Sequence, residues 1–489
     1  VWTCAPPEFG ARSVIDRFSQ VEPKLLVAVD GAWYGGKAID RRPELAAIRS
    51  ALPCLEATVV VPRLGAELPA NVLAWTELLA RGRGSRLAPR RVAFDHPLWI
   101  LYSSGTTGPP KAIVHSTGGI LLEHLKSNAL HLDLGPGDLF FWYTTTGWMM
   151  WNKLVSGLAV GASVLLYDGG AAHPGLSALW RLAADCGVTY FGVSAAFLDV
   201  CRRAGVEPKR FDLARLRALG STGSPLAPEG FAWVYEAVAS DLWLQSVSGG
   251  TDVCTAFLGG VPGAPVRAGE LQGRALGAAV EAWDADGRPV VDEVGELVVT
   301  APMPSMPLRF WNDPGGARYR ESYFEPWPGV WRHGDWIRIT PEGGAVIHGR
   351  SDATLNRHGV RLGSSEIYAV VEALPEVAEA LAVDVELPGR SAWMGLFVTL
   401  APGATLDAAL DARIRATLRR ELSPRHVPDA ILAVAAIPRT LNGKKLEVPV
   451  KKVLLGAAPE RVATAGSLAD PAALVAFTAI GERLRRGEL

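Results

Sequence analysis

Residues 24 to about 250 alternate short β-branched runs with helical segments, and this alternation restricts the possible folds more than any other feature. Strands are predicted at LLVAVD (25–30), TVVVP (58–62), LWILYS (98–103), SVLLYD (163–168), VTYFGV (188–193) and WLQSVS (243–248). Amphipathic helices are predicted between several of them, at 118–132, 176–186 and 227–239. Because such strand–helix–strand units bury near-continuously apolar strands on both faces, the segment predicts a largely parallel sheet flanked by helices.

The pattern changes twice further along the chain. From about 265 to 350, period-two strands with turn residues predict a small β-rich module, which includes the hairpin WIRITPEGGAVIHGR. After Arg350 the sequence predicts a helix near 364–374, strands near 380–400 and a helix at 406–422. A chain of 489 residues is too long for one core. We therefore predict an α/β N-terminal domain over 1–350 and a smaller, mobile α+β C-terminal domain over 351–489, with the boundary at Gly349–Asp352.

Charge and cysteine content exclude several classes of partner. The net charge is −1 with no basic or acidic tail, so neither a nucleic acid nor a membrane is expected as a partner. The longest apolar stretch, Leu154 to Tyr167, is shorter than a bilayer span and predicts a buried helix followed by a strand. The five cysteines are scattered and lack CxxC spacing, which favours reduced thiols in a cytosolic protein over a zinc site or disulfides.

The stretch YSSGTTGPPK (102–111) is rich in groups that bind phosphate, yet it departs from the Walker A pattern. That pattern requires glycine where Pro110 stands, and it continues into a helix, whereas Lys111 is followed by the strand-like AIVH. We therefore predict a loop that closes a hairpin, with backbone N–H groups and hydroxyls free to wrap phosphate oxygens. An ordinary Ser/Gly turn is the alternative for SSGTTG alone, and the PPK that follows favours a functional loop.

SSGTTGPPK resembles the phosphate loop of the adenylate-forming enzymes, which include acyl-CoA synthetases, luciferases and peptide-synthetase adenylation domains. Six further segments resemble motifs of that family in the same order: TTTGW (144–148), GSTGSPL (220–226), GGTDV (249–253), WRHGDW (331–336), GRSDATLNRHGVRLGSSEIY (349–368) and PRTLNGKK (438–445). Within the family, FFWYTTTGWMMWN, PSMPLRFWND and TLNGKKLEVPVKK are most similar to acetoacetyl-CoA synthetases. Those enzymes carry a further segment before the point where this sequence starts, so we expect the N-terminal domain to be truncated at its start.

The resemblance implies an ATP-dependent acid–thiol ligase whose small-molecule substrates are acetoacetate, ATP and coenzyme A. The acid attacks the α-phosphorus of ATP and expels pyrophosphate, and the acyl-adenylate then reacts with the thiol of coenzyme A. Donors and Mg²⁺ stabilise the charge that develops on the phosphates. The implied ATP-binding residues are Ser103, Ser104, Gly105, Thr106, Thr107, Gly108, Lys111, Gly223, Ser224, Pro225, Asp335, Arg350 and Arg361.

Three residues carry the implied catalytic roles. Thr251 would contact the α-phosphate and Asp252 would bind Mg²⁺. The family usually has Glu at position 252, so direct and water-mediated ligation both stay open. Lys444 would bridge the carboxylate and the α-phosphate during adenylation. A solvated surface lysine is the alternative reading of Lys444, since most lysines are exposed, and its neighbour Lys445 is the competing choice.

The resemblance also implies a conformational change and a sized acyl pocket. The C-terminal domain rotates about the hinge Asp352 and exchanges Lys444 for a coenzyme A tunnel. The implied tunnel residues are Asn356, His358 and Gly359, although His358 is equally explained as a surface histidine. Trp148, Gly249 and Gly250 would line the acyl pocket, because Gly249 stands where acetyl-CoA synthetases carry a bulky tryptophan that shortens it. The alternative is that both glycines only give backbone freedom at a strand end.

Two other functions stay open on sequence grounds. One is ligation of another short-chain acid such as acetate or propionate. The other is non-catalytic nucleotide binding. The oligomeric state is not indicated.

Overall fold

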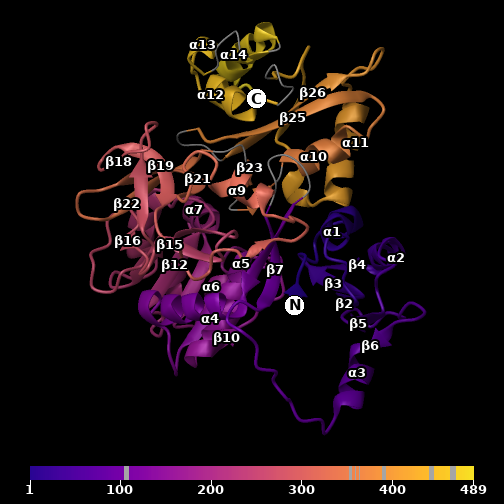
Figure 1. Cartoon of the computed structure of the whole chain (residues 1–489), viewed down its shortest axis with the longest axis vertical. Helices are drawn as coiled ribbons and strands as arrows, with labels where there is room; N and C mark the ends of the chain where they lie inside the picture. Colours follow the sequence, from indigo (N-terminus) through magenta and orange to yellow (C-terminus); the bar gives the residue numbers. More distant parts are fainter. Residues whose placement is uncertain are drawn as a thin grey trace. The chain divides into compact units, whose positions relative to one another are not determined.

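The computed structural model describes residues 1–103, 110–351, 355–357, 360–362, 364–387, 392–439, 445–462, 468 and 470–489. The chain divides into two compact units, which Figure 1 shows in sequence colours. Unit 1 consists mainly of Val14–Ser103 and Lys111–Gly349, and unit 2 mainly of Arg350–Leu489. No helix within the described ranges is both long and apolar enough to cross a membrane.

The central sheet of unit 1 has the strand order β10–β9–β11–β12–β13. Its strands are β9 (Leu139–Trp142), β10 (Ser163–Leu165), β11 (Tyr190–Ser194), β12 (Ala218–Thr222) and β13 (Trp243–Ser246). Every neighbouring pair is parallel. A parallel sheet is therefore confirmed for the predicted strands at 163–168, 188–193 and 243–248, whereas those at 25–30 and 58–62 form a separate parallel sheet and that at 98–103 belongs to an antiparallel pair.

Helices cover both faces of this sheet because successive side chains of a strand point to opposite faces. On one face, Phe141 and Phe191 pack against α6 (Ala178–Cys186), α7 (Ala195–Arg203) and α8 (Pro228–Ala237). On the other face, Phe140, Trp142 and Tyr190 pack against α4 (Thr117–Lys126) and α5 (Met149–Val155). With both faces covered, only the ends of the strands remain to meet a ligand.

Two predicted helices differ from those observed. The helix expected over 118–132 is α4 followed by a wider π-helical turn, Ser127–His131. The apolar run from Leu154 was expected to form a helix and a strand. Instead α5 ends at Val155, a 3-10 turn covers Ser156–Val160, and the strand β10 is short. Side chains across the turns explain part of this difference, since the Asn128 Nδ2 donates to the Ser156 Oγ at 2.9 Å.

The hairpin predicted around the phosphate loop is also present. Strands β7 (Pro97–Ser103) and β8 (Lys111–Ser116) pair antiparallel, with Ser103 opposite Lys111. Short strands β1 (Trp2–Thr3) and β20 (Arg309–Phe310) complete this sheet in the order β1–β7–β8–β20. Residues 104–109, which join β7 to Pro110 and the start of β8, lie outside the described residues.

A small sheet near the start of the chain has the order β2–β5–β6, with β2 (Leu25–Val29), β5 (Ala57–Val61) and β6 (Leu73–Ala74) parallel. The neighbouring segments of the chain form α1 (Ala11–Phe18), α2 (Arg42–Ala51), α3 (Trp75–Gly82) and the hairpin of β3 (Gly31–Tyr34) with β4 (Lys37–Asp40).

The β-rich module of unit 1 contains one sheet in the order β18–β17–β19–β21–β22. Its strands are β17 (Val280–Trp283), β18 (Pro289–Val290), β19 (Val294–Val299), β21 (Trp331–Ile339) and β22 (Ala345–Arg350). A second sheet joins β14 (Ser248–Gly250), β15 (Thr255–Gly259) and β16 (Gly273–Arg274). The short helix α9 (Ala317–Tyr323) shares one apolar core with both sheets.

Unit 2 is a sheet enclosed by two groups of helices (Figure 1). Strands β25 (Val377–Val385) and β26 (Trp393–Leu400) pair antiparallel, and β27 (Ala430–Ala433) is parallel to β26. Ala380 and Ala382 face α10 (Ser364–Val371) and α11 (Ala408–Glu421), whereas Leu381 and Val383 face α12 (Glu447–Leu454) and α14 (Pro471–Arg486). The unit also contains the hairpin of β23 (Leu355–Arg357) with β24 (Val360–Leu362), and α13 (Pro459–Val462).

Candidate active site

Three of the predicted motifs lie at one edge of the central sheet. The segment 144–148 follows β9, the segment 220–226 spans the end of β12, and the segment 249–253 follows β13. The register places Thr222 opposite Ser194, and Ser221 opposite Ser246, so these strand ends are level. The Thr222 hydroxyl donates to the Val247 carbonyl at 2.7 Å. Because ligands of open parallel sheets bind beyond the carboxyl ends of the strands, this edge is the expected position of a site.

Asp252 is the most constrained acidic residue at this edge. It lies in the turn between β14 and β15, and its side chain is buried. The Tyr323 hydroxyl donates to the Asp252 Oδ1, and the His115 Nε2 lies 2.8 Å from the Asp252 carbonyl oxygen. Since a carbonyl only accepts, His115 carries its proton on Nε2. Both the side chain and the main chain of Asp252 are thus held by neighbouring elements.

The tyrosine that contacts Asp252 belongs to an aromatic cluster. Tyr323 stacks on Trp331 with ring centroids 3.6 Å apart and planes at 12°. The Lys111 Nζ lies 4.9 Å from the Tyr323 ring centroid and 5.6 Å from that of Phe310, which places the cation over the rings. Burial, with the negative charge of Asp252 adding to it, raises the pKa of Tyr319 to about 12. Lys111, at the base of the phosphate loop, is therefore brought into the same cluster as Asp252.

Asp335 reaches the same region through β21. It is buried, and its Oδ2 lies 3.6 Å from the His333 Nε2. The His333 ring packs against Phe257 of β15 with centroids 4.6 Å apart. A Cβ on Gly250 would lie 2.5 Å from the His333 Cε1, so the close approach of this histidine requires glycine at that position. Asp252 and Asp335 are consequently linked across two sheets by Gly250 and His333.

Gly249 lies close to the backbone of the neighbouring strand. A Cβ at Gly249 would lie 2.1 Å from the Thr255 carbonyl oxygen and 2.7 Å from the Ala256 Cα. These are backbone atoms of the paired strand β15, which cannot give way as a side chain does. Gly249 therefore allows the close approach of β14 and β15, and its place in an acyl pocket stays a prediction. Of the predicted pocket residues, Trp148 packs partly buried against the apolar cluster beside β9.

Several predicted site residues lie outside the described residues. These are Ser104, Gly105, Thr106, Thr107 and Gly108 of the phosphate loop, Asp352, His358 and Gly359 of the hinge segment, and Lys444. Of Arg350, Asn356 and Arg361 the structure describes only the backbone, on β22, β23 and β24 respectively. Ser103, Lys111, Gly223, Ser224, Pro225, Thr251 and Asp335 are described, and all belong to unit 1.

Lys445, the alternative to Lys444, is fully engaged within unit 2. Its Nζ donates to the Glu372 Oε1 at 2.6 Å and to the Ala380 carbonyl at 2.7 Å, and it lies 3.8 Å from the Tyr368 ring centroid. These contacts hold Lys445 against α10 and β25. A side chain so bound has a structural role, which leaves Lys444 as the preferred candidate for the mobile cation.

The sequence motifs did not single out three residues of the cluster: Tyr323, His115 and His333. His333 precedes Asp335 by two positions on one strand, and such residues share a face, so a signal for it existed. His115 lies in the strand that Lys111 begins, but its contact is with a residue 137 positions away. Tyr323 contacts Asp252 across 71 positions, and nothing in its local sequence marks it.

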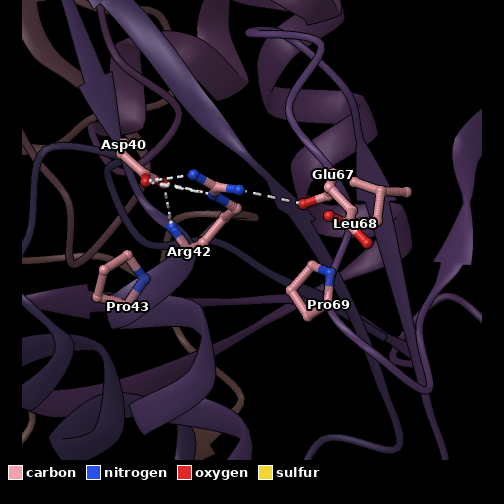
Figure 2. Close-up of a pocket in the computed structure, with 6 residues that line it drawn as sticks. All are labelled: Asp40, Arg42, Pro43, Glu67, Leu68 and Pro69. Carbon is pink, nitrogen blue, oxygen red and sulfur yellow. Dashed lines mark hydrogen bonds and ion pairs between the residues drawn. The ribbon is translucent and has the colours of Figure 1, made fainter.

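The surface depression in Figure 2 lies elsewhere in unit 1. It is an open hollow of about 380 Å³ lined by Asp40, Arg42, Pro43, Glu67, Leu68 and Pro69. The Arg42 guanidinium is already occupied, since it donates to both Asp40 carboxylate oxygens and to the Glu67 carbonyl. These hydrogen bonds from Arg42 lower the pKa of Asp40 to about 2. None of these residues belongs to the strands that carry the motifs, so we do not assign the depression to the active site.

Two family models match most of the chain. The model of the family described as AMP-binding enzyme matches residues 1–306, and that of the AMP-binding enzyme C-terminal domain matches residues 366–444. The chain belongs to the AMP-binding enzyme family. The matched ranges contain the loop at Lys111, the turn at Asp252 and the segment that ends at Lys444.

Individual relatives show which members of the family the chain is similar to. The chain is 48% identical over 490 residues to acetoacetyl-coenzyme A synthetase of Rhizobium meliloti (strain 1021), which covers 99% of this chain and 74% of the relative. A malonamoyl-CoA synthetase of Penicillium aethiopicum is 40% identical and matches 93% of this chain and 66% of its own length. The solved structure of acetoacetyl-CoA synthetase from Streptomyces lividans has a TM-score of 0.71 at 55% identity, and covers 99% of this chain and 74% of that one.

Proposed function

We propose that this protein is an acid–thiol ligase that converts acetoacetate, ATP and coenzyme A to acetoacetyl-CoA, AMP and pyrophosphate through an acyl-adenylate. The observation that carries the proposal is the convergence of Lys111, Asp252 and Asp335 on one sheet edge in a chain of the AMP-binding enzyme family. Two relatives named for acetoacetyl-CoA and malonamoyl-CoA support an acid with a second carbonyl group.

The proposed adenylation step uses the described residues as follows. The acid's carboxylate oxygen forms a bond to the α-phosphorus of ATP, and the bond to pyrophosphate breaks. Lys111, Ser103 and the loop that they flank bind the β- and γ-phosphates. Thr251 contacts the α-phosphate and Asp335 accepts from the ribose hydroxyls. Negative charge grows on the phosphates in this step, and fixed donors stabilise it without further reorganisation.

The residues at the sheet edge are compatible with Mg²⁺ that arrives with ATP. Within the described ranges, no three His, Cys, Asp or Glu side chains gather into a metal cluster. Mg²⁺ is commonly bound through one or two carboxylates together with substrate phosphates, and the buried Asp252 provides such a carboxylate. The ion would supply positive charge next to the phosphates.

In the proposed second step, the coenzyme A thiol attacks the acyl carbon and AMP leaves. We propose that unit 2 turns about Asp352 to remove Lys444 and present the 356–361 segment, with Asn356, His358 and Gly359 near coenzyme A, and with Arg350 and Arg361 near phosphates. We propose Trp148 and Gly250 as walls beside the acyl group, and Gly223, Ser224 and Pro225 beside adenine. All five cysteines are unpaired, which is typical of a reducing compartment, and we place the reaction in the cytosol.

The proposal is tested by separating the half-reactions in Lys444→Ala. Adenylate formation, trapped with hydroxylamine, should fall by about a hundredfold or more, because a lysine that bridges the transferring groups is lost. Formation of the thioester from a pre-made acyl-adenylate should persist. Lys445→Ala is the matched control, since it removes the neighbouring ammonium and its bonds to Glu372 and Ala380, and should reduce stability without separating the two steps.

A panel of acids identifies the substrate. Pyrophosphate release should be fastest with acetoacetate and slower with acetate, propionate and butyrate. If the wild-type protein forms no hydroxamate with any acid, the ligase proposal is wrong. If acetate is preferred, the ligase class stands and the acetoacetate assignment does not.

A further inference from the structure

The turn that carries Asp252 adopts an unfavourable backbone conformation. Its last residue, Cys254, has φ of 49°, which lies in the left-handed region that residues other than glycine seldom occupy. The turn joins β14 to β15 and is buried, with Val253 and Cys254 fully covered. Such a conformation persists only where surrounding contacts impose it. The contacts that hold the turn therefore also decide where the Asp252 carboxylate points.

Side chains from three other elements form hydrogen bonds to this turn. The Tyr323 hydroxyl, from α9, donates to the Asp252 Oδ1. The His115 Nε2, from β8, lies 2.8 Å from the Asp252 carbonyl oxygen. The His124 Nε2, from α4, lies 2.7 Å from the Cys254 carbonyl oxygen. Of these contacts, the one from Tyr323 acts on the carboxylate itself, and those from the histidines act on the main chain.

The Tyr323 side chain is fixed more firmly than one hydrogen bond requires. Its ring stacks on Trp331 and meets Phe310 edge-on at 5.8 Å between centroids. Lys111 covers the ring at 4.9 Å. Tyr323 is 3% exposed, so its side chain is almost completely enclosed by the protein. The ring thus directs one buried donor at one oxygen of Asp252.

We infer that Tyr323 is a positioning residue, which orients the Asp252 carboxylate toward the metal-bound nucleotide, and that His115 holds the main chain of Asp252 in the same orientation. This inference rests on the proposed function of the sheet edge. An aspartate carboxylate rotates about a broad terminal torsion when nothing holds it. A charged hydrogen bond to one oxygen limits that rotation before the nucleotide binds.

Tyr323→Phe tests this with the smallest possible change. Phenylalanine keeps the stack on Trp331 and the contact with Lys111, and it removes only the hydroxyl. We expect the Kd for Mn²⁺ with a non-hydrolysable ATP analogue, measured by calorimetry, to rise by about tenfold to a hundredfold. Adenylation should weaken by a similar factor, whereas thioester formation from a pre-made acyl-adenylate should stay unchanged. An unchanged Kd would overturn the inference.

A double-mutant cycle separates positioning from general loss of packing. If Tyr323 acts through Asp252, adding Tyr323→Phe to Asp252→Asn should change the Kd by less than about threefold. Equal effects of Tyr323→Phe in both backgrounds would show that it acts elsewhere. Tyr190→Phe is the control, because it also deletes one buried tyrosine hydroxyl, whose hydrogen bond goes to the Gln245 Oε1 at 3.1 Å and not to Asp252. It should leave the Kd unchanged.

His115 is tested by a pair of variants. His115→Gln retains an N–H at a similar reach and should keep the Kd within about threefold of the wild type. His115→Leu leaves the Asp252 carbonyl without this donor and should raise the Kd by about tenfold. If His115→Leu does not fold, the glutamine variant still decides, since a tenfold rise there would exclude the positioning role. Calorimetry reports binding even if no acid is adenylated, so failure of the ligase proposal is distinguishable from failure of this one.

Discussion

At the scale of single residues, an unusual buried ammonium lies near the turn that carries Asp252. Lys153 of α5 is 6% exposed, and its Nζ has no hydrogen-bond partner among the described atoms. Burial lowers the pKa of Lys153 to about 7, against the opposing attraction of Glu123. Lys126 and His124 of α4 and Cys254, the last residue of the turn before β15, also interact with it electrostatically. Because Cys254 belongs to the turn that carries Asp252, we expect the charge state of Lys153 to affect the stability of that turn.

Lys153→Met should therefore stabilise the protein near neutral pH. Unfolded Lys153 has a pKa near 10.5 and folded Lys153 one of about 7, so the unfolded state binds more protons between these values. Stability in the wild type must then rise with pH through that window, and the penalty is complete below pH 7. The substitution should increase the free energy of unfolding by about 1–4 kcal/mol at pH 7. It should also remove most of the increase in stability that the wild type shows between pH 7 and pH 10.

Urea denaturation of the wild type and the variant at pH 7 and pH 9.5 provides the measurement. Lys209→Met serves as the control, since Lys209 is exposed and its loss should have little effect at either pH. A marked destabilisation by Lys153→Met would mean that Glu123 holds the ammonium charged in the folded state.

The sequence motifs mark individual site residues, but they do not mark the residues that only the fold brings close to them. Asp252 and Asp335 were predicted from motif order, and both are buried at the sheet edge. Tyr323 was not predicted, because its contacts with Asp252, Phe310 and Trp331 exist only in the folded structure. At Gly249 the sequence indicates the absence of a side chain but not the direction in which one would point. That direction depends on pairing with β15.

At the scale of elements, α9 carries the Tyr323 that contacts Asp252, although its sequence has no strong helix signal. It spans only Ala317–Tyr323, too short to be stable alone. The Asp313 carboxylate accepts from the backbone N–H groups of Arg318 at 3.1 Å and Tyr319 at 2.9 Å. These bonds satisfy two backbone N–H groups in the first turn, for which the helix itself has no acceptor.

Asp313→Ala should loosen α9 and with it Tyr323. We expect a loss of about 1–2 kcal/mol in unfolding free energy, together with a raised Kd for the Mn²⁺-bound ATP analogue. Asp407→Ala is the control, because Asp407 similarly accepts from the Leu410 N–H at the start of α11 in unit 2. It should reduce stability by a comparable amount and leave the Kd unchanged. If both variants weaken nucleotide binding equally, the helix start at Asp313 has no specific role.

Long, periodic elements were predicted better than irregular ones. The parallel strands and the β7–β8 hairpin agree with the sequence pattern because burial on both faces and turn residues determine them locally. The π-helical turn at Ser127–His131 was not predicted. It forms where His131 bonds to the Gly260 carbonyl and accepts from the Leu276 N–H, and these partners lie far away in sequence.

At the scale of the whole molecule, each unit has apolar cores of its own. In unit 1, Phe231 belongs to the core between the central sheet and α6, α7 and α8. In unit 2, Phe477 belongs to the core between the sheet and α12 and α14. Both side chains are at most 2% exposed. Because the cores are separate, the units should respond separately to loss of packing.

Scanning calorimetry should show two unfolding transitions. Phe231→Ala should lower the midpoint temperature of the unit 1 transition alone, and Phe477→Ala that of the unit 2 transition alone. Each substitution should reduce the free energy of unfolding of its unit by about 3–5 kcal/mol. A joint shift of both transitions by either substitution would show that the chain unfolds as one cooperative body.

The alternation along β25 has an evolutionary consequence. Small alanines, Ala380 and Ala382, face one group of helices, and the larger Leu381 and Val383 face the other. Inserting one residue before them would exchange the two sets and leave one core overfilled and the other empty. Inserting two would return each side chain to a matching face. Descendants of this protein should therefore tolerate length changes within this strand in even steps, while the connecting loops can drift by any number of residues.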